Sequence, residues 1–147
     1  MPYWRLFYHV VWATHRRDPL LMGEVESFVH RILAVKCHEL GGQAFAINGT
    51  ADHVHLVGIV PPKLALAEFI GRLKGSSSRY TGLEFHLPFA WQEGYGVFTI
   101  SERGLPRAID YVRCQKEHHR AGTISARLER FSDADDGPLI APPFPPP

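Results

Sequence analysis

Cysteine and long apolar runs are both scarce in this chain of 147 residues. Its two cysteines, Cys37 and Cys114, are too few for a disulfide framework, and their spacing is not that of a zinc signature. No apolar stretch reaches the length needed to span a bilayer, and the first residues lack the pattern of a signal peptide. These absences exclude a disulfide-stapled secreted scaffold and predict a cytoplasmic protein with no membrane partner.

An excess of positive charge is also missing, since the formal net charge is only +1. Residues 1–122 hold 14 Lys/Arg and 11 Asp/Glu, a net charge of +3, whereas residues 123–147 hold 2 and 4, a net charge of −2. A body at +3 is far less basic than a protein that binds duplex DNA by charge alone. Binding of a short folded single strand is easier to reconcile with this charge, because base stacking and shape contribute to the affinity.

The composition is that of a globular domain, with 45% apolar and 21% charged residues. We predict one folded domain over residues 1–122, followed by a short, partly disordered, Pro-rich tail over residues 123–147. A frayed terminus is the simplest interpretation of that tail, although a Pro-rich segment can also dock on another surface.

Hydrophobic periodicity and turn residues predict the element order β-α-β-β-α-β-α. Two β-α-β halves of this kind indicate an α+β, ferredoxin-like fold (an RRM-like palm) with helices on one face of an antiparallel sheet. A turn that contains Asn48-Gly49 is expected between the two middle strands. The predicted strands span 3–12, 43–48, 53–60 and 95–100, and the predicted helices span 24–40, 64–80 and the segment from Leu105 to Gly122.

The most informative short pattern is His53-Val54-His55 at the start of a predicted strand. Side chains two residues apart in a strand leave the same face, so the two imidazoles stand side by side while Val54 points to the other face. Paired imidazoles at this spacing can hold one metal ion. The alternative is a half-buried strand whose histidines bond to backbone or water.

A second pattern lies about sixty residues downstream, in the last predicted helix. Tyr111 and Gln115 are four residues apart and therefore neighbour each other on a helix surface. They flank the apolar stripe of that helix, where they could face a site built on the sheet. Taken alone, this pattern favours an edge tyrosine packed against the core.

Together these patterns resemble the single-tyrosine insertion-sequence transposases of the HUH superfamily and their relatives, the REP-associated tyrosine transposases. The resemblance covers most of residues 3–120. It rests on several blocks in one order rather than on any single block. The blocks are the first strand at 8–14, His53-Val54-His55 preceded by Asp52, the second-helix motif at 73–79, the strand region at 91–98 and the nucleophile helix at 111–115.

The resemblance implies a DNA transposase that cleaves and rejoins single-stranded DNA through a covalent 5′-phosphotyrosine intermediate. In that interpretation Tyr111 is the nucleophile. His53, His55 and the side-chain oxygen of Gln115 hold Mg²⁺ or Mn²⁺, with the imidazoles shifting the preference toward Mn²⁺. The implied partners are DNA hairpins at element ends and a second copy of the chain, and the implied location is the nucleoid in a prokaryotic cytoplasm.

Basic side chains are expected to flank this site and contact DNA phosphates. Alternatives to a transposase are a domesticated relative that binds hairpin nucleic acid without mobilising DNA, and a small metal-dependent phosphoesterase. The intact set of predicted site residues argues against the first, and the lack of a second His-x-Ser/Thr element argues against the other. The predicted DNA-binding residues are Arg72, Lys74, Ser76, Arg79, Arg113 and Lys116.

Overall fold

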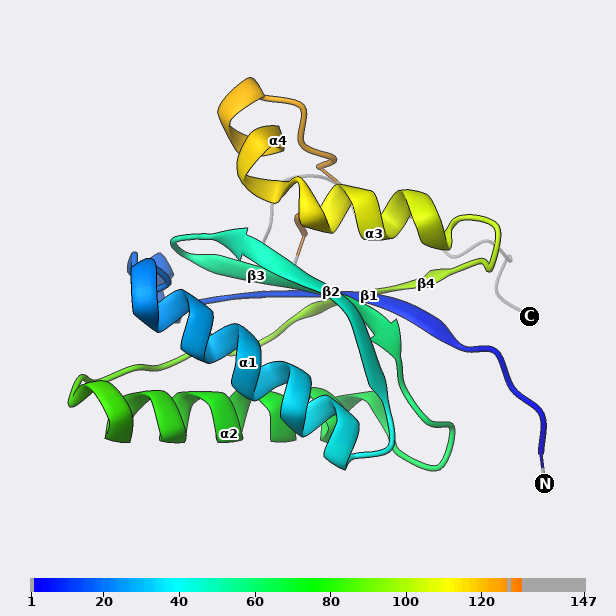
Figure 1. Ribbon diagram of the computed structural model, residues 1–147, viewed down its shortest axis with the longest axis horizontal. Helices are drawn as coiled ribbons and strands as arrows, with labels where there is room; N and C mark the ends of the chain where they lie inside the picture. The colour runs from blue at the N-terminus through cyan, green and yellow to red at the C-terminus, as the bar shows by residue number, and fades with distance from the viewer. Residues whose placement is uncertain (1, 127, 131–147) are drawn as a thin grey trace, which may run out of the picture.

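The computed structural model describes residues 2–126 and 128–130 of the chain. Its four strands form one antiparallel sheet in the order β2-β3-β1-β4, so β1 and β3 are central and β2 and β4 are the edges (Figure 1). The predicted α+β, ferredoxin-like class is confirmed, with the histidine pair on a central strand. The strands are β1 Phe7–Ala13, β2 Gln43–Thr50, β3 His53–Ile59 and β4 Gly96–Ile100; the helices are η1 His15–Arg17, α1 Gly23–Glu39, α2 Leu66–Phe85, α3 Leu105–Arg113 and α4 Gln115–Ala121.

The two long helices, α1 and α2, pack side by side on one face of the sheet (Figure 1). Alternate residues of the central strands supply the sheet side of this core, as the two-residue strand period requires. The helices contribute aliphatic and aromatic side chains at helical spacing. The fully buried members include Val10, Trp12, Val54 and Leu56 from the sheet, Val29 and Leu33 from α1, and Phe69, Ile70 and Leu73 from α2.

The opposite face of the sheet is covered by α3, which corrects the expectation of helices on one face only (Figure 1). Val112 is completely buried and packs with Ala46 and Val57 of the sheet. The strand sequence explains this second layer. Val57 points to the face opposite that of the neighbouring core residues of β3, so this face is also apolar and must be covered. This second layer brings the helix that carries Tyr111 over the face that carries the histidines.

The predicted helix after Leu105 is divided at Cys114, which corrects the expectation of one continuous element. Cys114 has φ −99° and ψ 21°, outside the helical region, and separates α3 from α4. The apolar stripe of α3 ends at Val112, and Gln115 is the one buried residue of α4. Because no apolar side chains continue the stripe, nothing keeps α4 on the same axis over the sheet.

The β2–β3 hairpin turns at residues 51–52 rather than at Asn48-Gly49, which lies within β2. Gly49 pairs with Val54, and a Cβ atom added to it would come within 2.1 Å of the His53 carbonyl oxygen. Glycine is therefore required here because the two strands approach closely, and not because the chain turns. The Asn48 side chain donates a hydrogen bond to the Arg113 carbonyl at 2.9 Å, which ties the hairpin to α3.

The other element boundaries move by a few residues. The first strand begins at Phe7 instead of residue 3, and the second long helix extends to Phe85 instead of residue 80. No helix among the described residues is long and apolar enough to cross a membrane. The predicted division at residue 122 stays a prediction, and its Pro-rich part, from residue 131 onward, lies outside the described residues.

The two cysteines lie in opposite environments, and we expect them to react differently with a thiol reagent. Cys37 is a completely buried residue of α1, and burial raises the pKa of its thiol to about 12, whereas Cys114 is exposed. The thiolate is the reactive form, so Cys37 should stay inert between pH 7 and pH 9 while Cys114 is labelled. Mass spectrometry should find one label in the native chain and two in denaturant. Labelling of native Cys37 at the rate of Cys114 would contradict the packing of α1.

Candidate metal and nucleophile site

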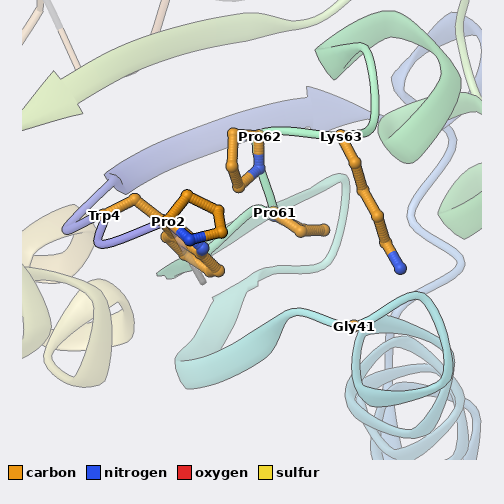
Figure 2. A pocket seen from close by; sticks show the side chains of 6 residues that line it. All are labelled: Pro2, Trp4, Gly41, Pro61, Pro62 and Lys63. Carbon is orange, nitrogen blue, oxygen red and sulfur yellow. The ribbon is translucent and has the colours of Figure 1, made fainter.

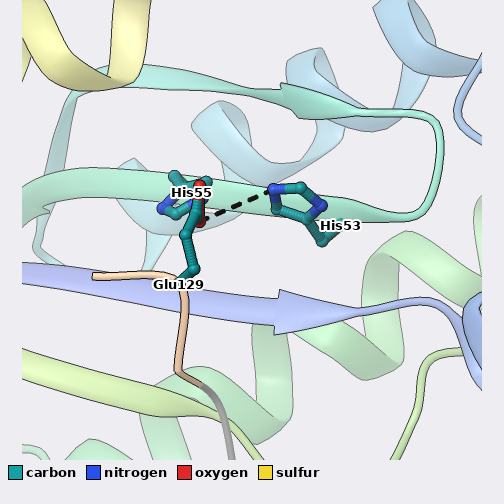
Figure 3. Close-up of side chains that lie close together, drawn as sticks. All are labelled: His53, His55 and Glu129. Atoms are coloured by element: carbon teal, nitrogen blue, oxygen red, sulfur yellow. Dashed lines mark ion pairs between the residues drawn. The ribbon is translucent and has the colours of Figure 1, made fainter. Parts of the chain in front are cut away.

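Two histidines on β3 form the centre of the site. His53 and His55 leave the same face of the strand, as their spacing predicts, and their ring centroids lie 5.1 Å apart. Val54 points to the other face and packs in the core with Trp12. Both imidazoles are almost completely buried. Figure 3 shows them on the strand, with Glu129 reaching over them from a segment that crosses the sheet.

Each histidine has a partner at its Nδ1 atom. His53 Nδ1 lies 2.8 Å from Asp52 Oδ1 and 2.9 Å from Thr50 Oγ1. His55 Nδ1 lies 2.8 Å from Nε2 of His9, a buried residue of β1. Partners of this kind orient the rings of metal-binding histidines and fix their tautomers, with Nε2 left as the donor atom for a metal.

The charges around these partners follow from burial and hydrogen bonding. Burial, reinforced by the neighbouring His55, lowers the pKa of His9 to about 3. Burial likewise lowers the pKa of His55. The hydrogen bond with His53 lowers the pKa of the Asp52 carboxyl to about 2. At neutral pH the imidazoles of His9 and His55 are therefore neutral, the form that binds metals, and the Asp52 carboxylate beside His53 is ionised.

Three buried donor atoms converge in front of the histidines. His53 Nε2, His55 Nε2 and Glu129 Oε2 have no hydrogen-bond partner among the described residues. The Glu129 oxygen lies 2.5 Å from His55 Nε2 and 3.7 Å from His53 Nε2. Buried polar atoms normally have hydrogen-bond partners, so two imidazole nitrogens that face one carboxylate oxygen without such a bond fit a bound cation. Two imidazoles and a carboxylate are a donor set suited to a divalent transition metal such as Mn²⁺.

Tyr111 lies beside this cluster at the end of α3. Its hydroxyl accepts a hydrogen bond from the Ser125 N–H at 2.9 Å and donates one to Glu129 Oε1 at 3.2 Å. Its ring stacks on His118, with centroids 4.8 Å apart, and its centroid lies 6.0 Å from that of His55. Burial raises the pKa of the phenol, which keeps it protonated at neutral pH. The structure thus brings the predicted nucleophile next to the predicted metal ligands.

Gln115 is completely buried at the first position of α4. Its Oε1 atom lies 3.1 Å from His119 Nε2, and its Nε2 atom lies 3.5 Å from the Tyr111 carbonyl. His119 in turn lies 2.8 Å from Glu129 Oε1. The predicted third ligand is therefore in the site, connected through His119 to the carboxylate above the histidine pair. Its role as a metal ligand stays a prediction.

Glu129 enters the site because the chain beyond α4 folds back over the sheet. A Cβ atom at Gly96 of β4 would come within 1.9 Å of the Arg130 carbonyl oxygen, so this glycine makes room for the crossing segment. Sequence reasoning missed Glu129 because it lies beyond the break at Gly122, in a stretch with no periodic pattern. It also missed His9, although the alternation of β1 puts this residue on the same face as Phe7 and Val11.

The predicted DNA-binding residues of α2 lie across the sheet from the histidines. This placement corrects the expectation that they flank the site, and its cause is that α2 packs on the Val54 face. Lys74 is half-buried and donates to the carbonyls of Gln92 and Gly94 at 2.7 and 2.9 Å. The other members line a hollow of about 440 Å³ formed by Lys36, Arg72, Gly75, Ser76, Arg79 and Tyr80.

The remaining two predicted DNA-binding residues lie near the site. Arg113 is exposed at the end of α3, three residues before Lys116. Lys116 contacts Glu26 Oε2 at 2.9 Å, Asn48 Oδ1 at 2.7 Å and the Gly49 carbonyl at 3.2 Å. Its ammonium group thus ties α4 to the β2–β3 hairpin, while Arg113 is available to solvent.

A separate hollow of about 290 Å³ lies where the N-terminal segment meets the turn after α1 and the end of β3 (Figure 2). Its lining is largely apolar and holds one charged side chain, that of Lys63. The residues that line it include no histidine, carboxylate or hydroxyl side chain. The lining residues are Pro2, Trp4, Gly41, Pro61, Pro62 and Lys63.

The family model described as transposase IS200 like matches residues 2–115. This chain belongs to the IS200-like transposase family. The resemblance identified from the sequence blocks is therefore confirmed, and the matched range includes Tyr111, both site histidines and Gln115.

Similar proteins cover about four fifths of this chain. It is 30% identical over 131 residues to the transposase for insertion sequence element IS200 of Salmonella typhimurium, which covers 81% of this chain and 82% of that one. It is 29% identical over 121 residues to the ISDra2 transposase TnpA of Deinococcus radiodurans, over 78% and 86% of the two chains. A solved REP-associated tyrosine transposase, bound to a REP hairpin, has a similar fold, with a TM-score of 0.60 and 12% identity over 84% of this chain and 76% of that one.

Proposed function

We propose that this IS200-like transposase cleaves and rejoins single-stranded DNA through a covalent 5′-phosphotyrosine link on Tyr111. The observation that carries the proposal is the hydrogen bond from the Tyr111 hydroxyl to the carboxylate that caps the buried histidine pair. A nucleophile, a cation site and an acceptor for the phenolic proton are thereby gathered on one face of the sheet. A metal hydrolase would need no such tyrosine.

The chemistry of Tyr111 proceeds in two displacements. In the first, its phenolic oxygen bonds to the scissile phosphorus and the bond from phosphorus to the 3′ oxygen breaks. The phenolic proton passes to Glu129 Oε1, which already accepts a hydrogen bond from that hydroxyl, and the departing 3′ oxygen takes a proton from solvent. In the second, a DNA 3′-hydroxyl attacks the same phosphorus and releases the phenol. The number of phosphodiester-type bonds is conserved, so rejoining needs no ATP.

The residues of the site also support a divalent cation. His53, His55 and Gln115 would hold Mg²⁺ or Mn²⁺, and Glu129 supplies a carboxylate that can join them. When bound, the cation would polarise and orient the scissile phosphate. The amide and phosphate oxygens favour Mg²⁺, whereas the two imidazoles shift the preference toward Mn²⁺.

The proposed partners are DNA hairpins at element ends and a second copy of the chain. A hairpin partner is supported by the similarly folded REP-associated tyrosine transposase, which is bound to a REP hairpin. A homodimer is supported by the two edge strands, β2 and β4, because sheet edges offer unpaired backbone groups to another chain. Sedimentation of the free chain and of its hairpin complex would determine the stoichiometry.

Trapping the covalent intermediate tests the proposed function. The full chain is incubated with labelled oligonucleotides that carry a hairpin and single-stranded flanks, with Mn²⁺ or with EDTA. We expect denaturing electrophoresis to show a metal-dependent protein–DNA adduct on single-stranded substrates alone. Cleavage that leaves a free 5′-phosphate and no adduct would favour a metal-dependent phosphoesterase. Hairpin binding without any cleavage would favour a domesticated binding protein.

Removing two arginines of the α2 hollow should weaken hairpin binding through lost phosphate contacts. For the double substitution Arg72→Gln with Arg79→Gln, we expect the salt slope of log affinity to fall by about 1.4 to 1.8, from two contacts at about 0.7 to 0.9 each. Fluorescence anisotropy at several salt concentrations measures this slope. The matched control, Arg103→Gln with Arg107→Gln, removes the same charge from two exposed positions, one in the turn before α3 and one in its first turn. Equal slopes for the two variants would contradict a specific role of the hollow.

A further inference from the structure

His9 is a buried imidazole that has no role in the proposed strand-transfer reaction. It lies on β1, is 1% exposed, and its Nε2 atom is 2.8 Å from His55 Nδ1. In the register of the sheet, His9 pairs with Val57, two residues beyond His55, so both imidazoles lie on the face of the site. A polar side chain this deeply buried requires a reason, because burying it without a partner costs free energy.

The hydrogen bond between the two rings has a consequence for His55. A neutral imidazole carries one N–H and one lone pair, so a bond between two ring nitrogens needs one donor and one acceptor. If His55 offers its Nε2 lone pair to a cation, its single proton must lie on Nδ1. The acceptor for that proton is then His9 Nε2.

We propose that His9 is a positioning residue of the metal centre, which accepts a hydrogen bond from His55 Nδ1 and thereby directs the His55 Nε2 lone pair toward the cation. This inference rests on the metal centre of the proposed function. His9 would thereby orient His55 in the way that the Asp52 carboxylate, 2.8 Å from His53 Nδ1, orients His53. Metal-bound histidines commonly have such a partner, and its loss typically weakens metal binding about 10- to 100-fold.

The surroundings of His9 explain why an imidazole occupies this position. Its ring lies among the rings of His55, Phe98 and Tyr111, with centroid separations of 5.0, 6.4 and 6.1 Å. These neighbours restrict the ring, so its Nε2 atom stays directed at His55. The carboxylate partner of His53, Asp52, lies at a partly exposed position. A carboxylate in place of His9 would instead bring an ionic charge into an enclosed position, at a high desolvation cost.

Metal affinity without DNA tests the proposal independently of catalysis. Mn²⁺ binding to the full chain is measured by calorimetry for the wild type, His9→Phe and His9→Gln. His9→Phe keeps a ring but has no acceptor, and we expect its affinity to fall about 10-fold or more. His9→Gln places an amide oxygen near the former Nε2 position and should recover most of that loss. Val10→Ala opens a cavity on the other face of β1, and we expect it to lower the Tm and leave the Mn²⁺ affinity unchanged.

A second measurement reads the proton directly and needs no variant. Nitrogen-15 NMR of the Mg²⁺-loaded wild type should show His55 protonated at Nδ1 alone. His55 protonated at Nε2, unchanged Mn²⁺ affinity in His9→Phe, or a His9→Gln variant as weak as His9→Phe would each overturn the inference while the metal centre stands. A wild-type chain that bound no Mn²⁺ or Mg²⁺ would overturn the metal centre itself, and the role of His9 with it.

Discussion

Tyr111→Phe should form no covalent adduct with DNA while it binds hairpins and Mn²⁺ like the wild type. The substitution removes one hydroxyl and leaves the ring that stacks on His118. Without that oxygen, nothing is positioned to attack the phosphate, and we expect cleavage to fall on the order of 10⁴-fold or more. The hydroxyl also bonds to Ser125 and Glu129, so the unfolding free energy should fall by about 1 kcal/mol. Denaturing electrophoresis and thermal melts measure both effects.

The matched control is Tyr80→Phe, which removes the same hydroxyl from a tyrosine that lies beside Arg72 and Arg79. Tyr80 is half-exposed and lines the α2 hollow, across the sheet from the histidines. It should form the adduct at the wild-type rate. Mass spectrometry of the trapped wild-type complex should place the nucleotide on the peptide that contains Tyr111. A nucleotide on Tyr80, or cleavage by Tyr111→Phe that leaves a free 5′-phosphate, would contradict the assignment.

The parts of the site that could be predicted are those set by the local period of the backbone. His53 and His55 are two residues apart, so they share one face once they are placed in a strand. The apolar stripe of α3 determines which side of that helix faces the sheet, and Tyr111 flanks the stripe. The long helices and the order of the elements along the chain followed from periodicity in the same way. These features need no knowledge of distant parts of the chain.

The parts that could not be predicted depend on contacts between distant segments. The packing of Val112 against Ala46 and Val57 places α3 on the face that carries the histidines. Because α2 packs on the opposite face with Val54, its basic residues lie across the sheet from the site. Asn48-Gly49 has the composition of a turn, but Gly49 is required for a close strand approach. Glu129 reaches the histidines only because the chain reverses after α4, a path that no local pattern encodes.

The second large effect is expected from the histidine pair, because the proposed chemistry depends on the cation that it would hold. Replacing both His53 and His55 with alanine removes two of the three buried atoms that converge in the site and leaves only the Glu129 oxygen. We expect Mn²⁺ binding to be lost and adduct formation to fall at least about 10³-fold, since cation stabilisation of the phosphate is worth several kcal/mol. EDTA should reproduce this loss in the wild type, and added Mn²⁺ should reverse it there but not in the variant.

Hairpin binding should change only a few-fold in the same double variant, because contacts with DNA phosphates lie mostly elsewhere. This separation distinguishes a missing cation from a misfolded chain, and a thermal melt of the variant provides an independent check of folding. The matched control is His38→Ala, which removes an imidazole from an exposed position of α1, on the other side of the sheet. It should bind Mn²⁺ and form the adduct like the wild type. Cleavage at the wild-type rate by His53→Ala with His55→Ala would show that the phosphate is activated by other groups, and the metal assignment would be wrong.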